Sequence, residues 1–327
     1  MIILIIKERT KPLVMLILEA LLRRLPHNHQ KYQQIFEELG RRQAGYIGEK
    51  SLDYYYRDLP HQKYMILHDL NLPDGDYNCQ IDTLLLTPEF ALAIDVKNMV
   101  GKLLFDTENE QFIQIKDGIE KGYPYPIAQG ERHQKYLQKL LAANHFPPVP
   151  VEYLVVISNS YTTYAVTGKN THKVKPQVCK ADVFLNKITL LEKQYSTPHL
   201  TTKDLRKLCR LLVKMNTVPT SYVLNKYDIK RSDLIPGVHC PSSSNHILIR
   251  KNQNWYCSIC DTFSKDAHLD ALKDYFLLFG PTITNKQFRE FTHIESRHLA
   301  KRLLQSCNLH YFGKNRYLIY SPKTTPW

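Results

Sequence analysis

Hydrophobic residues recur at helical spacing over the first part of the chain. Leucines follow this spacing along residues 8–28, and apolar and aromatic residues follow it again up to Leu59, with Gly45 and Gly48 between them. Apolar residues spaced three or four apart indicate an amphipathic helix. We therefore predict a helix over residues 8–28 and a second helical region over residues 29–59, interrupted at the two glycines.

Three short strands are predicted directly after these helices. Residues 64–72, 80–87 and 90–97 are rich in Leu, Ile, Val and Ala, the first run ends at Pro-Asp-Gly-Asp, and the second ends at Thr-Pro-Glu. Proline, aspartate and glycine in such clusters form tight turns. Because the connections are short, the three strands are expected to form an antiparallel meander.

The pattern continues with a strand, a helix and a buried strand. Residues 111–115 fit a fourth strand, residues 126–143 fit a helix with one apolar side, and residues 153–158 are almost continuously apolar. Such an unbroken run is typical of a strand covered on both faces. We predict an α/β domain with a mixed sheet over residues 29–195, preceded by an N-terminal helix over residues 1–28.

The remainder of the chain is assigned to a smaller C-terminal α+β module. After a linker, a helical connector is predicted over residues 203–235, a zinc-ribbon-like segment over residues 236–265, and a basic module over residues 266–327. The last module contains two short helical patterns followed by a strand at residues 316–320. Helices followed by a strand resemble a winged-helix or helix-turn-helix unit.

The net charge of +13 is concentrated in the second part of the sequence. Up to residue 199, lysines and arginines number 24 against 22 acidic residues, whereas from residue 200 onward they number 20 against nine. A basic excess of this kind favours binding to the phosphates of nucleic acid, with DNA as the expected partner. The alternative is a basic surface that only aids solubility.

Composition excludes several other classes of protein. The longest apolar runs fall short of the roughly 20 residues that a membrane helix needs, so no membrane partner is expected. No hydrophobic stretch is followed by a small-residue cleavage site, and a cytoplasmic location is therefore expected. Seven cysteines scattered over 327 residues argue against a disulfide framework.

Acidic residues and one lysine interrupt the apolar strands. Asp82 lies in one strand, and Asp95 and Lys97 lie two apart in the next, so that the latter two project from one face. Simple alternation also predicts that Asp82 shares a face with Leu84 and Leu86, opposite to Ile81. A carboxylate among apolar neighbours is costly unless it is paired or binds a cation.

These residue types suit a metal-dependent hydrolase. Carboxylates favour Mg²⁺ or Mn²⁺, which complete their coordination with water and phosphate oxygens, and such a metal activates water for attack on phosphorus. Gly45 and Gly48 in the preceding helix are expected to permit close approach of helix and sheet, so that Glu49 adds a third carboxylate. The alternative is structural: Asp95 and Lys97 form an exposed edge-strand pair and Asp82 caps a turn.

Three motifs resemble those of a known family. They are Gly45-x-x-Gly48-Glu49, Gln80-Ile-Asp82 and Ile94-Asp95-Val-Lys97-Asn98. Together they resemble the nuclease-related domain, NERD, which is similar to the PD-(D/E)XK nuclease superfamily. The resemblance covers about residues 30–160 and implies a restriction-endonuclease-like αβββαβ core.

The resemblance also implies roles for individual residues. Glu49, Asp82 and Asp95 match the metal-binding acids, Lys97 matches the catalytic lysine, and Gln129 matches a residue of the following helix that faces the same site. Two positions depart from the family pattern. Asp95 stands where the family often has glutamate, and Tyr125 precedes Pro126 where asparagine is common.

A second metal site is suggested by clustered cysteines. Cys257-x-x-Cys260 forms one typical zinc knuckle, but the second has only Cys240, because serine occupies position 243. A closed zinc site would then need a histidine, which could be His239, His246 or His268. The alternative is a degenerate ribbon without metal, held together by packing of Trp255 and Tyr256.

The C-terminal module supplies candidate contacts to phosphate. Arg297, Lys301 and Arg302 lie on the second of its two predicted helices, although an ordinary surface helix would have the same pattern. Combining these features, we predict a Mg²⁺-dependent DNA endonuclease or DNA-processing enzyme. The alternatives are a DNA-binding or scaffold protein that keeps the fold without turnover, and a nuclease that acts on RNA.

Overall fold

The structure is a computed structural model that describes residues 4–60, 63–217, 223–314 and 317–323, with the side chains of residues 4 and 243–245 excepted. Its contacts divide the chain into two compact units. Unit 1 comprises Met1–Thr10 and Gln43–Pro219, and unit 2 comprises Lys11–Arg42 and Thr220–Trp327. Among the described residues, no helix combines the length and the apolar character needed to span a membrane.

Unit 1 contains most of the strands of the chain. In chain order its elements are β1 (Leu4–Lys7), the end of α2 (Tyr32–Ser51), α3 (Asp53–Tyr56), β2 (Met65–Asp74), β3 (Tyr77–Leu86), β4 (Ala91–Lys97), β5 (Lys102–Asp106), β6 (Gln111–Lys116), β7 (Ile119–Tyr123), α4 (Pro126–Ala143), β8 (Val151–Ile157), β9 (Thr163–Thr167), α5 (Thr171–Val174), β10 (Val178–Lys180), α6 (Phe184–Gln194) and α7 (Thr202–Met215).

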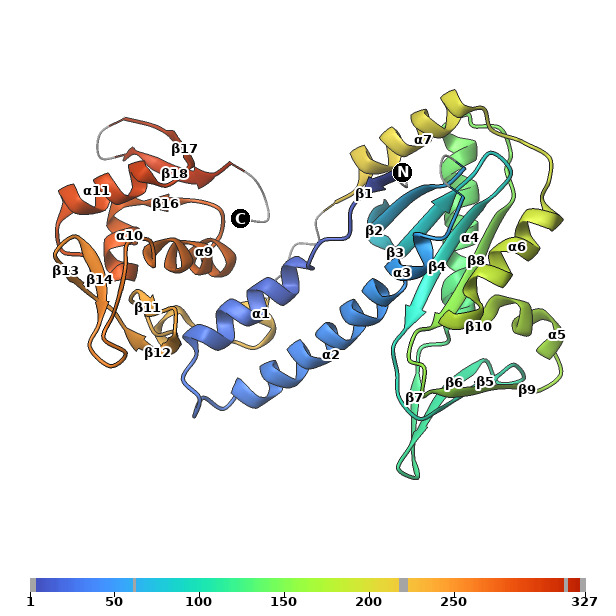
Figure 1. Ribbon diagram of the computed structural model, residues 1–327, viewed down its shortest axis with the longest axis horizontal. Coiled ribbons are helices and arrows are strands. Elements are labelled where there is room, and N and C mark those ends of the chain that lie inside the picture. The colour runs from blue at the N-terminus through green and yellow to red at the C-terminus, as the bar shows by residue number, and fades with distance from the viewer. Residues whose placement is uncertain (1–3, 61–62, 218–222, 315–316, 324–327) are drawn as a thin grey trace. The chain divides into compact units, whose positions relative to one another are not determined.

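A six-stranded mixed sheet forms the centre of unit 1, in the order β1-β2-β3-β4-β8-β10. The predicted antiparallel meander is confirmed by the pairing of β2 with β3 and of β3 with β4. The predicted buried strand, β8, pairs in parallel with β4. Residues of α4 and α7 pack on one face of the sheet, and residues of α3 and α6 pack on the other (Figure 1).

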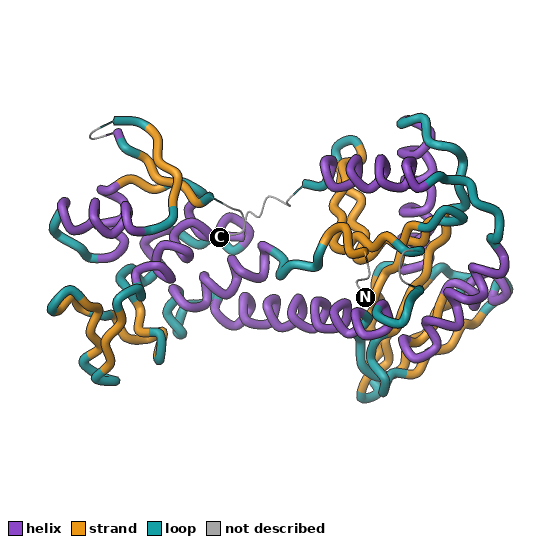
Figure 2. Tube along the Cα trace, turned by 45° about the horizontal axis from the view of Figure 1, so that its top comes forward, coloured by secondary structure: helices purple, strands orange, loops and turns teal. Residues whose placement is uncertain are grey.

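A second sheet of unit 1 has the order β7-β6-β5-β9. The strand predicted at residues 111–115 is present as β6, but it belongs to this second sheet and not to the central one. Figure 2 shows the strands of both sheets in orange, with purple helices beside them. The strand that follows β4 in the central sheet is therefore β8, which lies beyond α4 in the chain.

The start of the chain differs from its prediction. Residues 4–7 form β1, a strand that pairs in parallel with β2 and was not predicted. The first helix, α1 (Leu13–Arg24), begins only after Pro12, which is its N-cap residue. A short apolar run such as Leu4–Lys7 has no helical or alternating spacing of its own, so only pairing with β2 makes it a strand.

The second predicted helix is not interrupted. α2 continues through Gly45 and Gly48 to Ser51, and α3 follows after one residue. A glycine inside a helix costs about 1 kcal/mol relative to alanine. Tertiary contacts near Gly48 outweigh that cost, which makes the predicted break wrong.

Unit 2 combines helices with three small sheets. In chain order its elements are α1, most of α2, α8 (Val223–Lys226), β11 (His239–Cys240), β12 (Ser243–Ile247), β13 (Ile249–Lys251), β14 (Asn254–Cys257), β15 (Thr262–Ser264), α9 (His268–Phe279), β16 (Ile283–Thr284), α10 (Asn285–Thr292), α11 (Arg297–Ser306), β17 (Leu309–Phe312) and β18 (Ile319–Pro322).

The end of unit 2 has two short helices, α10 and α11, as predicted from the sequence. The strand predicted at residues 316–320 begins outside the described residues, and the observed strand is β18, which lies between β16 and β17 in a three-stranded antiparallel sheet. A buried ion pair joins two helices of this unit, because Arg24 Nε lies 2.8 Å from Asp274 Oδ2. Arg24 also donates to the carbonyl of Gly237 at 2.7 Å.

Candidate functional site

Asp82 and Asp95 occupy the point where β3 and β4 separate. The last paired residues of the two strands are Thr83 and Ile94, so the two aspartates come next, on opposite strands. Asp82 Oδ2 accepts a hydrogen bond from the backbone N–H of Val96 at 2.8 Å. A side chain therefore replaces the backbone acceptor of the ladder, and the strands open where the two acids lie.

Lys97 and Gln129 lie beside Asp95. Lys97 Nζ is 2.7 Å from Asp95 Oδ2 and donates to Gln129 Oε1 at 3.4 Å. Gln129 reaches this position from α4, which packs closely on β8 because Gly130 has no side chain: a Cβ there would overlap the ring of Tyr153. The structure thus brings together the lysine, the acid and the glutamine that were predicted to share a site.

Glu49 enters from the last turn of α2, and only one of the two nearby glycines explains how. A Cβ at Gly48 would overlap the side chain of Asn98 and lie 2.8 Å from Ser158 Oγ, whereas a Cβ at Gly45 would meet nothing within 4 Å. The prediction that both glycines permit close approach of helix and sheet is therefore wrong for Gly45. Asn98 completes the contact by donating to the carbonyl of Ala44 at 2.7 Å.

Burial and neighbouring carboxylates raise the pKa of Glu49 and of Asp82. Burial raises the pKa of Glu49 to about 7, against which the charge of Arg9 acts, while Asp69 and Asp95 add to the rise. Burial, followed by the charges of Asp95 and Glu49, holds the pKa of Asp82 well above its usual range. Like charges in a partly desolvated site favour the neutral form unless a cation is present. The cluster therefore has the electrostatic character of a cation site.

Arg9 is a major part of this site and was missed by sequence reasoning. Its side chain is 4% exposed, and its Nη1 lies 2.8 Å from Glu49 Oε2 and 3.3 Å from Asp69 Oδ1. Its Nε lies 3.6 Å from a carboxylate oxygen of Asp53. An arginine shortly after an apolar run looks like an ordinary surface charge. The signal that could have found it is recognition of that run as a strand of the central sheet.

His68 and Thr83 bind the other end of the Arg9 guanidinium. Arg9 Nη2 lies 2.9 Å from His68 Nδ1 and donates to Thr83 Oγ1 at 3.0 Å. Because a guanidinium has only donors, His68 Nδ1 must be the acceptor, which makes the imidazole neutral with its proton on Nε2. Burial, with the charges of Arg9 and Lys7, accordingly lowers the pKa of His68 to about 3.

The simple alternation predicted for β3 is wrong at one point. Ile81 belongs to the same core cluster as Leu84 and Leu86, although alternation places it on the opposite face. The reason lies in the neighbouring strand, where Asp69 has a φ of +51° between the paired residues His68 and Leu70. This left-handed residue breaks the pleat of the two strands beside Asp82.

The carboxylates do not form a tight ligand set by themselves. Among the described residues, the one group of three potential ligands whose atoms all lie within 4.8 Å of one another is Cys240, Cys257 and Cys260. Glu49 is held by Arg9, Asp82 by the backbone of Val96, and Asp95 by Lys97. Each acid therefore has its own partner in place of a shared ligand.

The cysteine cluster has the dimensions of a zinc site. Cys240 Sγ and Cys260 Sγ are 4.0 Å apart, and the Cys260 N–H donates to Cys257 Sγ at 3.5 Å. Zinc–sulfur bonds of about 2.3 Å in a tetrahedron place two sulfurs about 3.8 Å apart. The three thiols thus fit three of the four positions around zinc.

The histidines proposed as fourth ligand lie outside this group of three cysteines. Neither ring nitrogen of His239 has a hydrogen-bond partner in the described part of the chain, and burial lowers its pKa to about 4. His268 instead accepts from Trp255 Nε1 at 3.2 Å. Position 243 belongs to the residues whose side chains are not described. The structure therefore leaves the fourth position unassigned.

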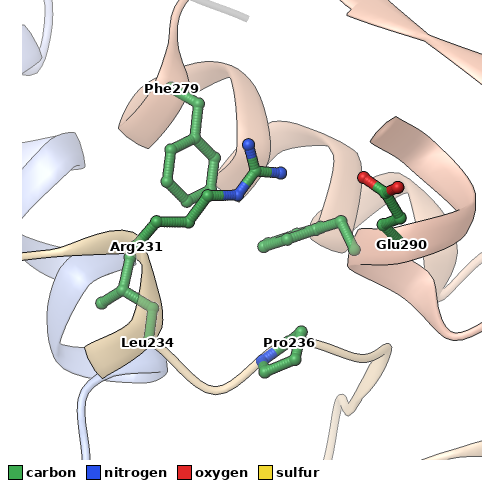
Figure 3. A pocket seen from close by; sticks show the side chains of 6 residues that line it. Arg231, Leu234, Pro236, Phe279 and Glu290 are labelled. Atoms are coloured by element: carbon green, nitrogen blue, oxygen red, sulfur yellow. The ribbon is translucent and has the colours of Figure 1, made fainter. Parts of the chain in front are cut away.

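The other predicted contacts are on the surface of unit 2. Arg297, Lys301 and Arg302 are exposed on α11. A small pocket of the same unit is lined by residues that include Arg231, Phe279 and Glu290, and Figure 3 shows the Arg231 guanidinium against the Phe279 ring. None of the predicted site residues lines that pocket.

Comparison with known proteins gives one match. Residues 44–158 match the family model of the nuclease-related domain, NERD. This range contains the acids, the lysine and the glutamine described above, and it leaves out Arg9 and the whole of α11. No curated protein and no solved structure matches the chain.

Proposed function

We propose, from the nuclease-related domain that this chain carries at residues 44–158, that unit 1 is a metal-dependent nuclease acting on DNA. The observation that carries the proposal is the meeting of Asp82 and Asp95 at the opened end of β3 and β4, with Lys97 beside them. The order α2, β2-β3-β4, α4, β8 agrees with the αβββαβ core implied by the sequence resemblance.

The metal would be Mg²⁺ or Mn²⁺, held by Glu49, Asp82 and Asp95. These three carboxylates supply the hard oxygen donors that these ions prefer, and the negative charge of the cluster raises the pKa of Glu49 and of Asp82. When bound, the ion would neutralise charge on the phosphate and lower the pKa of a water ligand. Glu49 must lose its proton before it can coordinate the ion. The ion pair with Arg9 orients the Glu49 carboxylate.

Lys97 and Gln129 would act on the water and the phosphate. Hydrolysis forms a bond from the water oxygen to phosphorus and breaks the bond from phosphorus to the sugar oxygen. The sugar oxygen keeps the electrons of the broken bond, and the proton lost by the attacking water is balanced by the proton that this oxygen takes up from solvent. Lys97 Nζ, next to Asp95 and Gln129, is placed to orient the water and to offset negative charge that develops on phosphorus. Gln129 positions the Lys97 ammonium through its Oε1.

Unit 2 would supply affinity for nucleic acid and a structural zinc site. Its helix order and three-stranded sheet support a winged-helix-like unit, in which Arg297, Lys301 and Arg302 of α11 would contact phosphates. Cys240, Cys257 and Cys260 would hold zinc and keep β11 close to the end of β14. Neither site takes part in the hydrolysis itself.

The enzyme proposal is tested by incubating the purified chain with plasmid DNA and with RNA, in Mg²⁺, in Mn²⁺ and in chelator. DNA cleavage is expected only with metal, and Lys97→Ala and Asp95→Asn are expected to reduce it by at least about 100-fold. Lys102→Ala, which removes an exposed lysine of β5, is the matched control and should keep full activity.

Equal cleavage by the wild type and Lys97→Ala with every metal would overturn the enzyme proposal. Binding of DNA without any cleavage would instead support a scaffold that keeps the fold. Cleavage of RNA in preference to DNA would change the substrate and leave the chemistry of the site intact.

A further inference from the structure

The sequence from Ser296 to the last residue contains no acidic side chain. This stretch has six lysines and arginines and includes α11, β17 and β18. Arg297, Lys301 and Arg302 lie on the exposed side of the helix, and Lys314 is exposed where the chain leaves β17. A surface with cations and without nearby carboxylates from its own segment is complementary to a polyanion.

Large aromatic side chains are exposed on the same segment. Tyr311 is 70% exposed and Phe312 is 52% exposed, both on β17, and Tyr317 is 66% exposed close to the start of β18. β17 is the edge strand of its sheet, while its partner β18 is central and buries Tyr320. Because adjacent residues of a strand project to opposite faces, Tyr311 lies on the same face as its cross-strand partner Tyr320, with 6.4 Å between the ring centroids, and Phe312 lies on the other face.

The aromatic strand directly follows the basic helix. α11 ends at Ser306 and β17 begins at Leu309, and the Cys307 N–H donates to the carbonyl of Leu303 in the last turn of the helix. Leu303 and Leu304 pack in the same core cluster as Tyr320. The cations of α11 and the exposed rings of β17 thus belong to consecutive elements of unit 2 that share one core.

Phosphate binding alone does not need the exposed rings. Cations suffice for the phosphates of a duplex, whose base faces are stacked on one another and unavailable, whereas unpaired bases stack on aromatic side chains irrespective of sequence. We propose that α11 and β17 bind DNA in which unpaired bases adjoin a duplex, with the cations on the phosphates and with an unpaired base stacking on the ring of Tyr311 or of Phe312, which lie on the two faces of the edge strand. This proposal rests on the proposed function, since it specifies the substrate of the same protein.

Equilibrium binding in chelator tests the proposal independently of cleavage. The full-length Lys97→Ala chain is titrated into a labelled blunt duplex and into the same duplex with a single-stranded extension, and fluorescence anisotropy is recorded. The extended duplex is expected to bind about tenfold more tightly. Tyr311→Ala with Phe312→Ala should abolish this preference and leave the affinity for the blunt duplex unchanged within about twofold.

Three further variants separate stacking from charge and from misfolding. Tyr311→Trp with Phe312→Tyr keeps both rings and should keep the preference, whereas Tyr311→Leu with Phe312→Leu keeps the apolar surface and should lose it. Tyr77→Ala removes a ring of unit 1 that is 81% exposed, and it should leave the affinity for both DNAs unchanged. Arg297→Ala with Lys301→Ala and Arg302→Ala should weaken binding of both DNAs.

The proposal is overturned if the wild-type surface binds blunt and extended duplexes equally, or if the double alanine variant keeps the preference. Unchanged affinity of the triple variant for both DNAs would also overturn it. A chain that shows the binding preference but never cleaves DNA would refute the proposed function alone, because the binding experiment contains no metal.

Discussion

Arg9 and Glu49, 40 residues apart in the sequence, form an ion pair of 2.8 Å in which the Arg9 side chain is buried and Glu49 is partly exposed. The arginine follows β1, and the glutamate lies in the last turn of α2. The same guanidinium reaches Asp69 at 3.3 Å, so one cation balances acids from two elements of unit 1. This pairing links the start of the chain to the candidate metal site.

Replacement of Arg9 is expected to destabilise unit 1. Arg9→Met leaves Glu49 and Asp69 without their counter-charge, and the loss of one partner of a buried pair costs about 3–5 kcal/mol. Arg9→Lys keeps the charge but cannot make the same forked contacts, so a smaller loss is expected. The free energy of unfolding is measured from the urea transition of unit 1.

The control for Arg9 is an exposed pair of the same unit. Lys169 lies 2.6 Å from Glu108 on the surface, and Lys169→Ala should cost less than about 1 kcal/mol. If Arg9→Met were as stable as Lys169→Ala, Arg9 would not be the partner that holds the acids in place.

Replacing each of the two glycines of α2 by alanine should change stability in opposite directions. Gly45→Ala adds a methyl group in open space and should stabilise the helix by up to about 1 kcal/mol. Gly48→Ala forces α2 away from Asn98, which should displace Glu49, lower stability and reduce metal-dependent cleavage. Thermal unfolding and cleavage rates of the two variants are compared; a tolerated Gly48→Ala would contradict the close approach.

His68 should make the protein sensitive to acid. Its pKa is lowered from 6.5 to about 3 by burial and by Arg9, so the unfolded chain binds a proton more readily than the folded one. The stability that depends on neutral His68 is thus present above pH 6.5 and is lost as pH falls toward 3, by up to about 1.4 kcal/mol per pH unit.

Urea unfolding between pH 7 and pH 4 is the measurement for His68. His68→Asn should flatten the decline in stability, whereas the same change at the exposed His172 should leave the wild-type profile unaltered. If His68→Asn shows the same dependence of stability on pH as the wild type, His68 does not contribute to that dependence.

The cysteine cluster is expected to bind about one zinc per chain. Cys257→Ser and Cys240→Ser each remove one sulfur ligand and should abolish stoichiometric zinc, with a lower melting temperature for unit 2. Cys307→Ser is the control, because this buried thiol lies outside the cluster. Elemental analysis of the purified wild type and variants gives the number of zinc ions per chain. Wild-type protein without zinc would contradict the assignment of a zinc site.

Much of the local structure followed from residue pattern alone. The meander of β2, β3 and β4, the helix α4 and the buried strand β8 were predicted because tight turns and apolar periodicity are local properties. Asp82, Asp95 and Lys97 were conspicuous for the same reason: polar residues in apolar strands need an explanation. Their roles remain proposals.

The remaining features depended on contacts between distant segments. Residues 4–7 form a strand because they pair with β2. α2 continues through both glycines, and its second glycine, Gly48, packs against Asn98. The alternation of β3 broke at Ile81 because Asp69, in the neighbouring strand, has a left-handed backbone. Nothing in the spacing of either segment indicates such an event.

The sequence by itself determined which residues interrupt the apolar strands and where β2, β3, β4 and β8 of the central sheet lie. Only the tertiary structure decided that β1 joins this sheet, that Arg9 balances Glu49, and that His239 stays outside the group of three cysteines. The physical reason is range: hydrophobic periodicity and turn formation act over a few residues, whereas ion pairs and ligand sets require the chain to bring distant residues within a few ångströms.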